Sequence, residues 1–387
     1  MKKFLALVLS ALMMFSMTAC GTQQIPASDQ ETPASSSQPA SQPAEPATPS
    51  ASSDTGSDDV PSIFKEKKIK IAIVRNLTAD DGTKLFMATA QEIGKEWGWQ
   101  VDTFITNNND VQFQDTVTQI IQQDYDGIYI SHGKAEYSYD LLKPAVEKGM
   151  KICTFDTIAN DANGNPHPGV TAIAQDDEMM GEYSVNKIIS LGNGNDPIKV
   201  LKLWFGPGAI SALDVRNSVY EKYEKEGLIE TVDVIGPTNM DDVMGDMYSR
   251  VSAALALYPE GTIDAVWGSW DELAKGALQA ILEANRTEIK VVTVDCSDMD
   301  LNLMRENPDV FKACVGLHQK LYAVVGLRLL AFKLAELETP DTYKIPVNLI
   351  EVEALTPNSN VDNLNEIIPD WGVVTDYYAP WMENLGK

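Results

Sequence analysis

The chain has 387 residues, of which 44% are hydrophobic, and it carries a formal net charge of −26 at pH 7. This excess of negative charge excludes nucleic acid and anionic lipid as main partners, because both carry charge of the same sign. The hydrophobic content suffices for a folded core, and the length exceeds one typical domain, so two domains are expected.

The first residues have the pattern of an export signal. Two lysines precede an apolar run over residues 4–17, and small residues lead to Cys20. The run is shorter than the roughly 20 residues that span a bilayer as a helix, so residues 1–19 are predicted to be a cleaved signal peptide. The stretch Met17-Thr18-Ala19-Cys20 resembles the bacterial lipobox, which implies lipidation of the Cys20 thiol. The alternative is an incidental thiol near an ordinary cleavage site.

Residues 20–61 are predicted to form a lipid-anchored, disordered tether. They consist almost entirely of Ser, Ala, Pro, Gln, Thr and Asp, which cannot bury enough apolar surface to fold. A lipid anchor holds a domain at the outer face of the cytoplasmic membrane without a transmembrane helix. A long tether of this kind suits a cell without an outer membrane, so a Gram-positive origin is expected.

The remaining chain alternates short apolar runs with helical patterns such as residues 84–97 and 113–123. Short apolar strands that are each followed by an amphipathic helix predict an α/β fold, with parallel sheets covered on both faces. The strands form two sets, residues 69–174 and 199–317, each large enough for its own doubly wound sheet. The ten predicted strands are residues 69–74, 101–106, 127–131, 151–155, 170–174, 199–204, 231–235, 265–268, 290–295 and 311–317.

Three further cysteines, Cys153, Cys296 and Cys314, lie inside apolar runs. Their odd number and their surroundings favour small core residues over a disulfide framework. Their spacing does not fit a zinc site, so the sequence predicts neither a metal nor a cofactor.

Polar and aromatic residues that directly follow strands are the candidates for a binding site, since ligands of doubly wound sheets bind at the carboxyl ends of the strands. The alternative for each of them is that it simply caps the next helix. The residues in question are Arg75, Asn76, Ser131, His132, Asp156, Thr157, Trp204, Phe205, Ser269, Trp270, Asp271, Asp295, His318 and Gln319.

Six segments in order resemble the type I periplasmic sugar-binding proteins, the ribose and galactose receptors of ABC importers. The resemblance covers residues 70 to about 352. The segments are Ile71-Ala72-Ile73-Val74 with the loop to Asp81; Lys151 to Asp156; Ala174-Gln175-Asp176-Asp177 with Gly181; Trp204-Phe205-Gly206-Pro207-Gly208 to Arg216; Ala265 to Glu272 with Gly276-Ala277; and Val291 to Asp295.

The resemblance implies two doubly wound parallel-sheet lobes joined by a three-strand hinge. The crossings between the lobes are expected near residues 174–175, 317–318 and 350–351. The first lobe is then residues 62–174 plus 319–350, and the second is residues 175–318 plus 351–387. Residues beyond Glu353 extend past the usual end of the family, and Trp371 and Trp381 have no assigned role there.

The resemblance also implies roles for three residues that hydrogen-bond a sugar. Asp156 and Asp295 would accept hydrogen bonds from sugar hydroxyls, one aspartate from each lobe. Arg216 would donate to the ring oxygen and to a hydroxyl of the sugar. Alanine at any of the three is expected to abolish binding and leave the fold intact, on the expectation that each lies outside the core. The remaining candidates for ligand binding are Asn76, Asp81, His132, Trp204, Trp270, Asp271 and His318.

Trp270 stands where many members of the family have an Asn before the Asp-Glu pair, so the identity of the sugar stays open. The expected function is a monomeric lipoprotein that captures a simple sugar between two lobes and delivers it to an ABC permease. An enzyme is disfavoured, because the chain has no GxSxG, GxxxxGK or HExxH motif. A sensory receptor of the same fold, or a receptor for a nucleoside or a furanosyl signal, remains an alternative.

Overall fold

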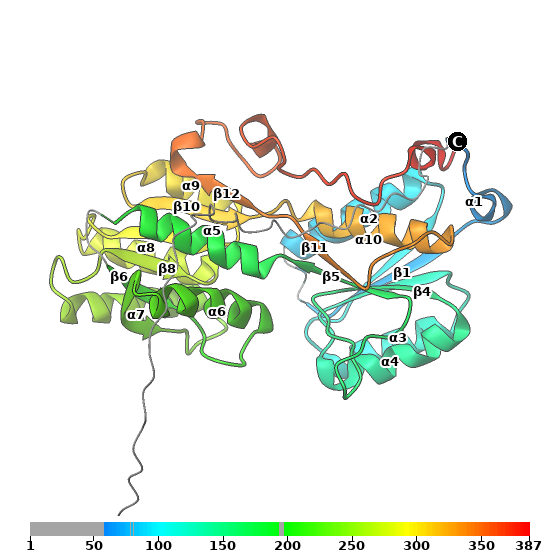
Figure 1. Ribbon diagram of the computed structural model, residues 1–387, viewed down its shortest axis with the longest axis horizontal. Coiled ribbons are helices and arrows are strands. Elements are labelled where there is room, and N and C mark those ends of the chain that lie inside the picture. Colours follow the sequence, from blue (N-terminus) through cyan, green and yellow to red (C-terminus); the bar gives the residue numbers. More distant parts are fainter. Residues whose placement is uncertain (1–57, 78, 80, 193–196) are drawn as a thin grey trace, which may run out of the picture. The chain divides into compact units, whose positions relative to one another are not determined.

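The computed structural model describes residues 58–77, 79, 81–192 and 197–387. The predicted signal peptide, Cys20 and the tether up to residue 57 lie outside these residues. The described chain forms two α/β lobes, each built on a six-stranded sheet (Figure 1). Within the described ranges, none of the helices has the length and apolarity needed to cross a bilayer.

The first lobe has an all-parallel sheet with the strand order β11-β5-β4-β3-β1-β2. Its strands are β1 (Lys70–Arg75), β2 (Gln100–Ile105), β3 (Gly127–Ser131), β4 (Lys151–Phe155), β5 (Val170–Gln175) and β11 (Thr342–Ile345). Its helices are α1 (Ser62–Glu66), α2 (Asp81–Glu96), α3 (Asp110–Gln122), α4 (Ala135–Lys148) and α10 (Lys320–Leu334).

The alternation of side chains along the strands divides this lobe into two cores. Ile71 and Ile73 of β1 pack with α2 and α10 on one face of the sheet. Ala72 and Val74 of the same strand pack with α3 and α4 on the other face. Both faces are therefore covered, which explains why β1 and β3 are almost continuously apolar.

The second lobe has the strand order β12-β10-β9-β8-β6-β7. Its strands are β6 (Ile198–Leu203), β7 (Ile229–Ile235), β8 (Ala265–Gly268), β9 (Lys290–Val294), β10 (Phe311–Gly316) and β12 (Asn348–Glu351). All are parallel except β12, which pairs antiparallel with β10. Its helices are α5 (Asp177–Ser190), α6 (Ser211–Lys225), α7 (Val243–Leu257), α8 (Asp271–Glu283), α9 (Asp298–Glu306) and the short η1 (Val352–Ala354) and η2 (Leu364–Glu366).

Two cores also fill the second lobe. Helices α5 and α6 cover one face of its sheet around Tyr220 and Trp267, and α7, α8 and α9 cover the other. Helices α7 and α8 pack closely because Gly276 has no side chain: a Cβ atom there would lie 2.3 Å from the Met244 carbonyl oxygen. The predicted α/β fold with two doubly wound lobes is confirmed, and each of the ten predicted strands corresponds to an observed one.

The chain passes between the lobes three times: after β5, after β10 and after β11. The first two crossings agree with the expected positions. The third lies between Ile345 and Asn348, because β11 pairs with β5 and β12 pairs with β10. The expected crossing at residues 350–351, and with it the lobe boundary at residue 350, is therefore wrong by a few residues. Strands β11 and β12 were not predicted, since they are short and only partly buried.

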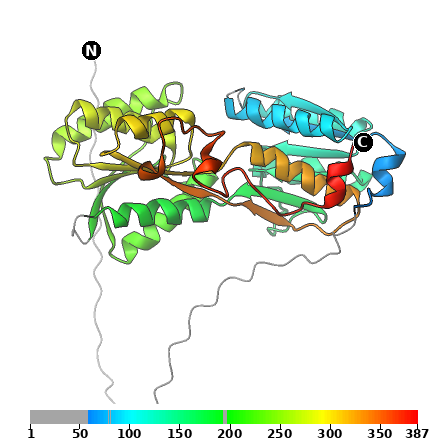
Figure 2. The ribbon, with the colours of Figure 1, turned by 90° about the horizontal axis from the view of Figure 1, so that it is seen from above.

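The expectation that residues 351–387 belong wholly to the second lobe is wrong, because the segment is divided between the two lobes. Leu364 and Trp371 are buried in the second lobe. Trp381, within η3 (Pro380–Asn384), is instead buried in the core of the first lobe, together with residues from Val374 to Leu385. Phe64 of α1 stacks on Trp381 and on Trp99, with ring centroids 5.3 and 5.6 Å apart. Figure 2 shows the last, red segment of the chain beside the blue α1. The chain's last segment thus packs against α1 and near Trp99, which follows α2.

Candidate functional site

Two strands in different lobes end in an aspartate with left-handed backbone geometry. Asp156 follows β4 with φ of 41°, and Asp295 follows β9 with φ of 72°. His132, directly after β3, has φ of 62°. Residues other than glycine rarely adopt this conformation, and where they do they often lie at a functional site. The strand ends of both lobes are therefore the place to build the site.

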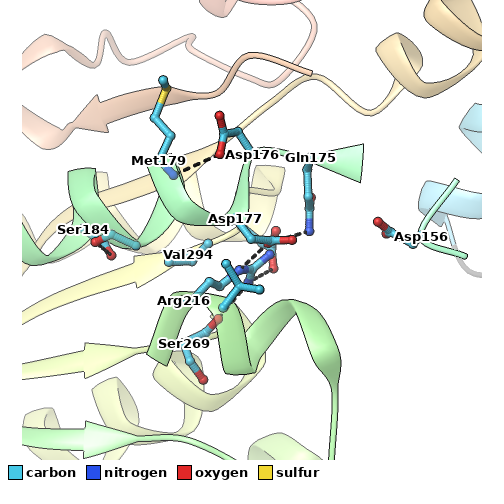
Figure 3. A network of polar contacts seen from close by, with 12 residues as sticks. Asp156, Gln175, Asp176, Asp177, Met179, Ser184, Arg216, Ser269 and Val294 are labelled. Atoms are coloured by element: carbon cyan, nitrogen blue, oxygen red, sulfur yellow. Dashed lines mark hydrogen bonds and ion pairs between the residues drawn. The ribbon is translucent and has the colours of Figure 1, made fainter. Parts of the chain in front are cut away.

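Arg216 of α6 lies at the centre of the site in the second lobe (Figure 3). Its Nε donates to Asp177 Oδ1 at 2.8 Å, and its Nη1 donates to the Ser269 carbonyl at 2.8 Å and to Asp295 Oδ2 at 3.1 Å. Burial alone would lower the pKa of Arg216, but the carboxylates of Asp295 and Asp177 raise it above its ordinary value, so the guanidinium is a permanent cation. Among the described residues these bonds leave Nη2 for a ligand.

Arg216 is only 1% exposed. The premise that Arg216 lies outside the core, on which the expectation of an intact fold in the alanine variant rests, is therefore wrong, because the side chain is buried between charged partners. Removing it would strand the carboxylate of Asp177, which is itself largely buried. The side chains of Asp156 and Asp295 are 25% and 30% exposed, so for these two positions the premise of the expectation holds.

Asp177 is a site residue that the sequence did not single out. It opens α5 directly after the first crossing, beside Asp176, whose side chain caps the helix by accepting from the Met179 amide. The pKa of Asp177 is raised to about 6 by burial, against the opposing effect of Arg216. An Asp-Asp pair after a strand is so typical of helix capping that the second carboxylate gave no separate signal.

Gln175, the last residue of β5, connects the first crossing to the site. Its Nε2 donates to Asp177 Oδ1 at 3.2 Å, and its Oε1 accepts from the Tyr322 hydroxyl at 3.2 Å. Tyr322 lies on α10, which follows the second crossing. Two of the three crossings are thus hydrogen-bonded to each other and to the Arg216 group.

Asp156 provides the carboxylate of the first lobe, and Figure 3 shows it facing the Arg216 group. Burial and the negative charge of Asp177 raise its pKa to about 7, although Arg75 and Arg216 oppose the shift. His132 lies beside it, with Nε2 3.9 Å from Asp156 Oδ2. The pKa of His132 falls to about 3 because of burial and the nearby Arg75 charge, so the imidazole is neutral. Its Nδ1 is 2.6 Å from the Ser131 hydroxyl.

Asn76 and Asp81 are the other two candidates for ligand binding in the first lobe. Asn76 is 4% exposed, and its amide is used within the protein: Nδ2 donates to Asp110 at 2.8 Å, and Oδ1 accepts from Thr106 at 2.7 Å. It holds the strand-end loops together and does not join the Asp156 carboxylate. Asp81 is the first residue of α2, but its side chain lies outside the described residues.

Asp271 belongs to a separate buried ion cluster. Its carboxylate accepts from Lys275 Nζ at 2.8 Å, and the same Nζ lies 3.6 Å from Asp300. Burial and the neighbouring Asp300 raise the pKa of Asp271 well above its ordinary value. Asp300 also forms a capping box with Ser297 at the start of α9. The structure therefore places Asp271 among residues that connect α8 and α9, and it is linked to the Arg216 group through the nearby charge of Asp295, which also raises the pKa of Asp271.

His318 is 2% exposed and lies beneath the C-terminal segment, with its ring centroid 6.1 Å from that of Trp371. Its Nδ1 accepts from the Lys320 amide at 3.3 Å. Burial and the Lys320 charge lower its pKa. Asp362 approaches Nε2 to 3.3 Å without the alignment of a hydrogen bond. Among the described residues, the contacts of His318 are thus with Lys320, Asp362 and Trp371, and not with Asp156 or Arg216.

Trp204 and Trp270 follow neighbouring strands of the second lobe, β6 and β8, and both are partly exposed. The ring of Trp270 lies 5.9 Å from that of Phe205. Trp204 packs its ring over Lys202 Nζ at 4.8 Å, and its own indole nitrogen is buried without an acceptor among the described residues. Trp270 directly follows Ser269, whose carbonyl accepts from Arg216.

Comparisons with known proteins match this architecture. The family described as periplasmic binding protein domain matches residues 71–331. A crystal structure of a sugar ABC transporter protein from Yersinia enterocolitica is 38% identical, with a TM-score of 0.73, and the match covers 84% of this chain and 97% of that one. A 5-methylthioribose transporter solute-binding protein from Thermotoga lettingae, in complex with 5-methylthioribose, is 25% identical with a TM-score of 0.72 and 84% and 99% coverage.

A more distant solved structure, an ABC transporter solute-binding protein from Agrobacterium vitis with bound allitol, is 20% identical with a TM-score of 0.62. It covers 74% of this chain and 97% of its own, and its likeness concerns the fold alone. The curated proteins contain no match.

Proposed function

The chain belongs to the periplasmic binding protein domain family, and from this premise we propose that it is an extracytoplasmic receptor that captures a simple sugar between its two lobes and delivers it to an ABC permease. The observation that carries the proposal is the Asp177–Arg216–Asp295 group with Asp156 opposite to it. The names of the two most similar structures described above support the same class of ligand.

The chemistry of this group suits a sugar. Neighbouring hydroxyls of a furanose or pyranose donate to carboxylates, and a ring oxygen accepts from a guanidinium. Arg216 is held in place by three bonds before any ligand arrives, so little side-chain freedom is lost on binding. A ligand that contacts Asp156 in one lobe and Asp295 in the other would stabilise the closed arrangement by its differential affinity for it.

A panel of sugars tests the proposal. The melting temperature of the purified chain is measured with uncharged monosaccharides, nucleosides and polyols, because a ligand bound only by the folded state raises it by mass action. We expect a shift with one sugar and its close epimers, and its loss in Asp295→Asn. Asp309→Asn is the matched control, since Asp309 is exposed and precedes β10 at the opposite end of the strands. Absence of a shift with every sugar would refute the proposal.

We propose further that Cys20 carries the lipid that anchors the receptor at the outer face of the membrane, with residues 20–61 as its tether. The support is the sequence pattern before Cys20. Expression in a Gram-positive host with a labelled fatty acid should label the wild-type chain, and Cys20→Ser should be unlabelled and released into the medium. A labelled Cys20→Ser chain would contradict this assignment.

A further inference from the structure

Two aromatic side chains form a patch at the carboxyl ends of two neighbouring strands in the second lobe. The aromatic patch consists of Phe205 after β6 and Trp270 after β8, whose ring centroids lie 5.9 Å apart. Leu203 and Gly268, the last residues of these strands, are paired in the sheet. The patch thus lies on the strand-end edge of the sheet that also bears Asp295.

The aromatic patch adjoins the polar site through Ser269. The Ser269 carbonyl accepts from Arg216 Nη1 at 2.8 Å, and the next residue is Trp270. Both aromatic residues are partly exposed, whereas Trp267, three residues before Trp270, is fully buried in the core. Aromatic surface that stays accessible beside a charged group is typical of a ligand-binding wall.

The apolar character continues beyond the rings. Ile210, between β6 and α6, is 41% exposed, and Met240, between β7 and α7, is 59% exposed. The loops after β6 and β7 therefore both present exposed apolar side chains at the same end of the sheet. A ligand with an apolar part would remove some of this surface from water, at roughly 25 cal/mol per Å².

The amide side chains near the polar site are largely engaged within the protein. Asn76 bonds to Asp110 and Thr106, and Gln175 bonds to Asp177 and Tyr322, which leaves each amide one further N–H. Among the described residues, the other polar groups left for a ligand include the carboxylates of Asp156 and Asp295, the Nη2 of Arg216 and the buried hydroxyl of Ser269, which has no hydrogen-bond partner there. The faces of the two aromatic rings offer no such group, so a sugar hydroxyl packed on them would lose its water without gaining a partner, which costs about 1–3 kcal/mol.

The charge of the site also limits the ligand. Arg216 is bonded to two carboxylates, and Arg75 lies near the third, Asp156, whose pKa is raised to about 7, so above this pH three carboxylates meet two guanidinium groups. A phosphate or a carboxylate on the ligand would meet this acidic surplus and be repelled.

We propose that the site selects uncharged sugars with an apolar edge, such as deoxy or alkylthio sugars, over the fully hydroxylated parent sugars and over sugar acids and sugar phosphates. The hydroxylated edge of the sugar binds the Asp156, Arg216 and Asp295 group, and its deoxygenated or alkylated edge contacts the aromatic patch. This inference rests on the proposed function and names the substrate class of the same site.

Matched ligand pairs measured by titration calorimetry test the proposal on the full chain. The pairs are 5-deoxyribose or 5-methylthioribose against ribose, L-rhamnose against L-mannose and L-fucose against L-galactose, with ribose 5-phosphate and galacturonate as charged probes. We expect one deoxy or alkylthio sugar to bind more tightly than its parent by on the order of tenfold or more, and neither charged probe to bind.

Two variants of one position show whether the aromatic patch is responsible. Trp270→Asn should reduce the preference within the best pair to near unity, and Trp270→Phe, which keeps an aromatic ring, should retain most of it. Equal affinity for both members of every pair, or tighter binding of the parent sugars, would overturn the inference and leave the proposed function standing. Absence of binding by all the uncharged sugars would overturn both.

Discussion

The Nε of Arg216 donates to Asp177 Oδ1 at 2.8 Å, so the first residue of α5 and the buried cation of α6 form one ion pair beside the first crossing between the lobes. The pair is not an isolated binding element. It continues through Gln175 to Tyr322 and thereby links the candidate site to the second crossing. Substitutions in it should affect folding as well as binding.

Arg216→Met is expected to abolish sugar binding and to lower the free energy of unfolding by about 3–5 kcal/mol, because it leaves a buried carboxylate without its partner. The double variant Arg216→Met, Asp177→Asn should regain part of that loss, since the unpaired charge is gone. Urea unfolding of both variants measures the difference. A single variant as stable as the wild type would show that the ion pair contributes nothing to the fold.

Asp156 should make the ligand-free protein less stable as the pH rises. Its pKa in the folded state is raised to about 7 by burial and by Asp177, so the folded state holds a proton that the unfolded state has released. Its contribution to stability is therefore present below about pH 4 and is lost as the pH rises through about 7. The side chain is 25% exposed and partly screened by water, which limits the effect to about 1–2 kcal/mol.

Asp156→Asn tests this directly, because asparagine has the same shape without the titration. The free energy of unfolding of the variant should equal that of the wild type near pH 4 and exceed it by about 1–2 kcal/mol near pH 8. The variant should bind sugar poorly at both pH values. Unfolding curves at the two pH values give the comparison, with Asp309→Asn as the exposed control. A stability difference that is the same at both pH values would contradict the assignment of a raised pKa.

The C-terminal segment should be required for the stability of the first lobe. Trp381 is 4% exposed and stacks on Phe64, so Trp381→Ala removes a large buried side chain and should cost about 3–5 kcal/mol. Val373→Ala, at a position 50% exposed, is the matched control and should be nearly neutral. Thermal unfolding distinguishes them. Equal melting temperatures for the two variants would show that the segment only rests on the surface.

The packing of α7 on α8 gives a prediction that does not involve the site. Gly276→Ala usually favours a helix by about 1 kcal/mol, but here the new Cβ would lie 2.3 Å from the Met244 carbonyl oxygen. The cost of this close contact should exceed the gain in helix propensity, so the variant should destabilise the second lobe by about 1–3 kcal/mol. Gln279→Ala, on the exposed side of the same helix, should change little. Stabilisation by Gly276→Ala would mean that the two helices separate readily.

Much of the fold could be predicted because its strands are buried on both faces. Such strands are continuous apolar runs, and β1, β3 and β9 are visible in the sequence for that reason. The edge strands β11 and β12 are short and partly exposed, so they carry no comparable pattern. The C-terminal segment has no helical or strand period from which its packing on the first lobe could be inferred.

The site was predictable to the extent that its residues follow strands. Asp156 and Asp295 stand directly after β4 and β9, and the structure gives both the same unusual backbone conformation. The partners inside the protein could not be predicted, because hydrogen bonds of Asn76 and the ion pairs of Asp271 depend on side chains distant in sequence or one helical turn away. A position directly after a strand indicates a candidate binding residue. Only the hydrogen bonds and ion pairs of that residue show whether its side chain is free to bind a ligand.

Titration calorimetry of the wild type, Asp156→Asn and Asp295→Asn with the sugar that gives the largest thermal shift tests the central claim most directly. We predict one site per chain in the wild type and affinity lowered about 100-fold or more in each variant, because each removes a carboxylate that accepts a sugar hydroxyl from a different lobe. Unchanged affinity in both variants would contradict the claim that the sugar binds between Asp156 and Asp295.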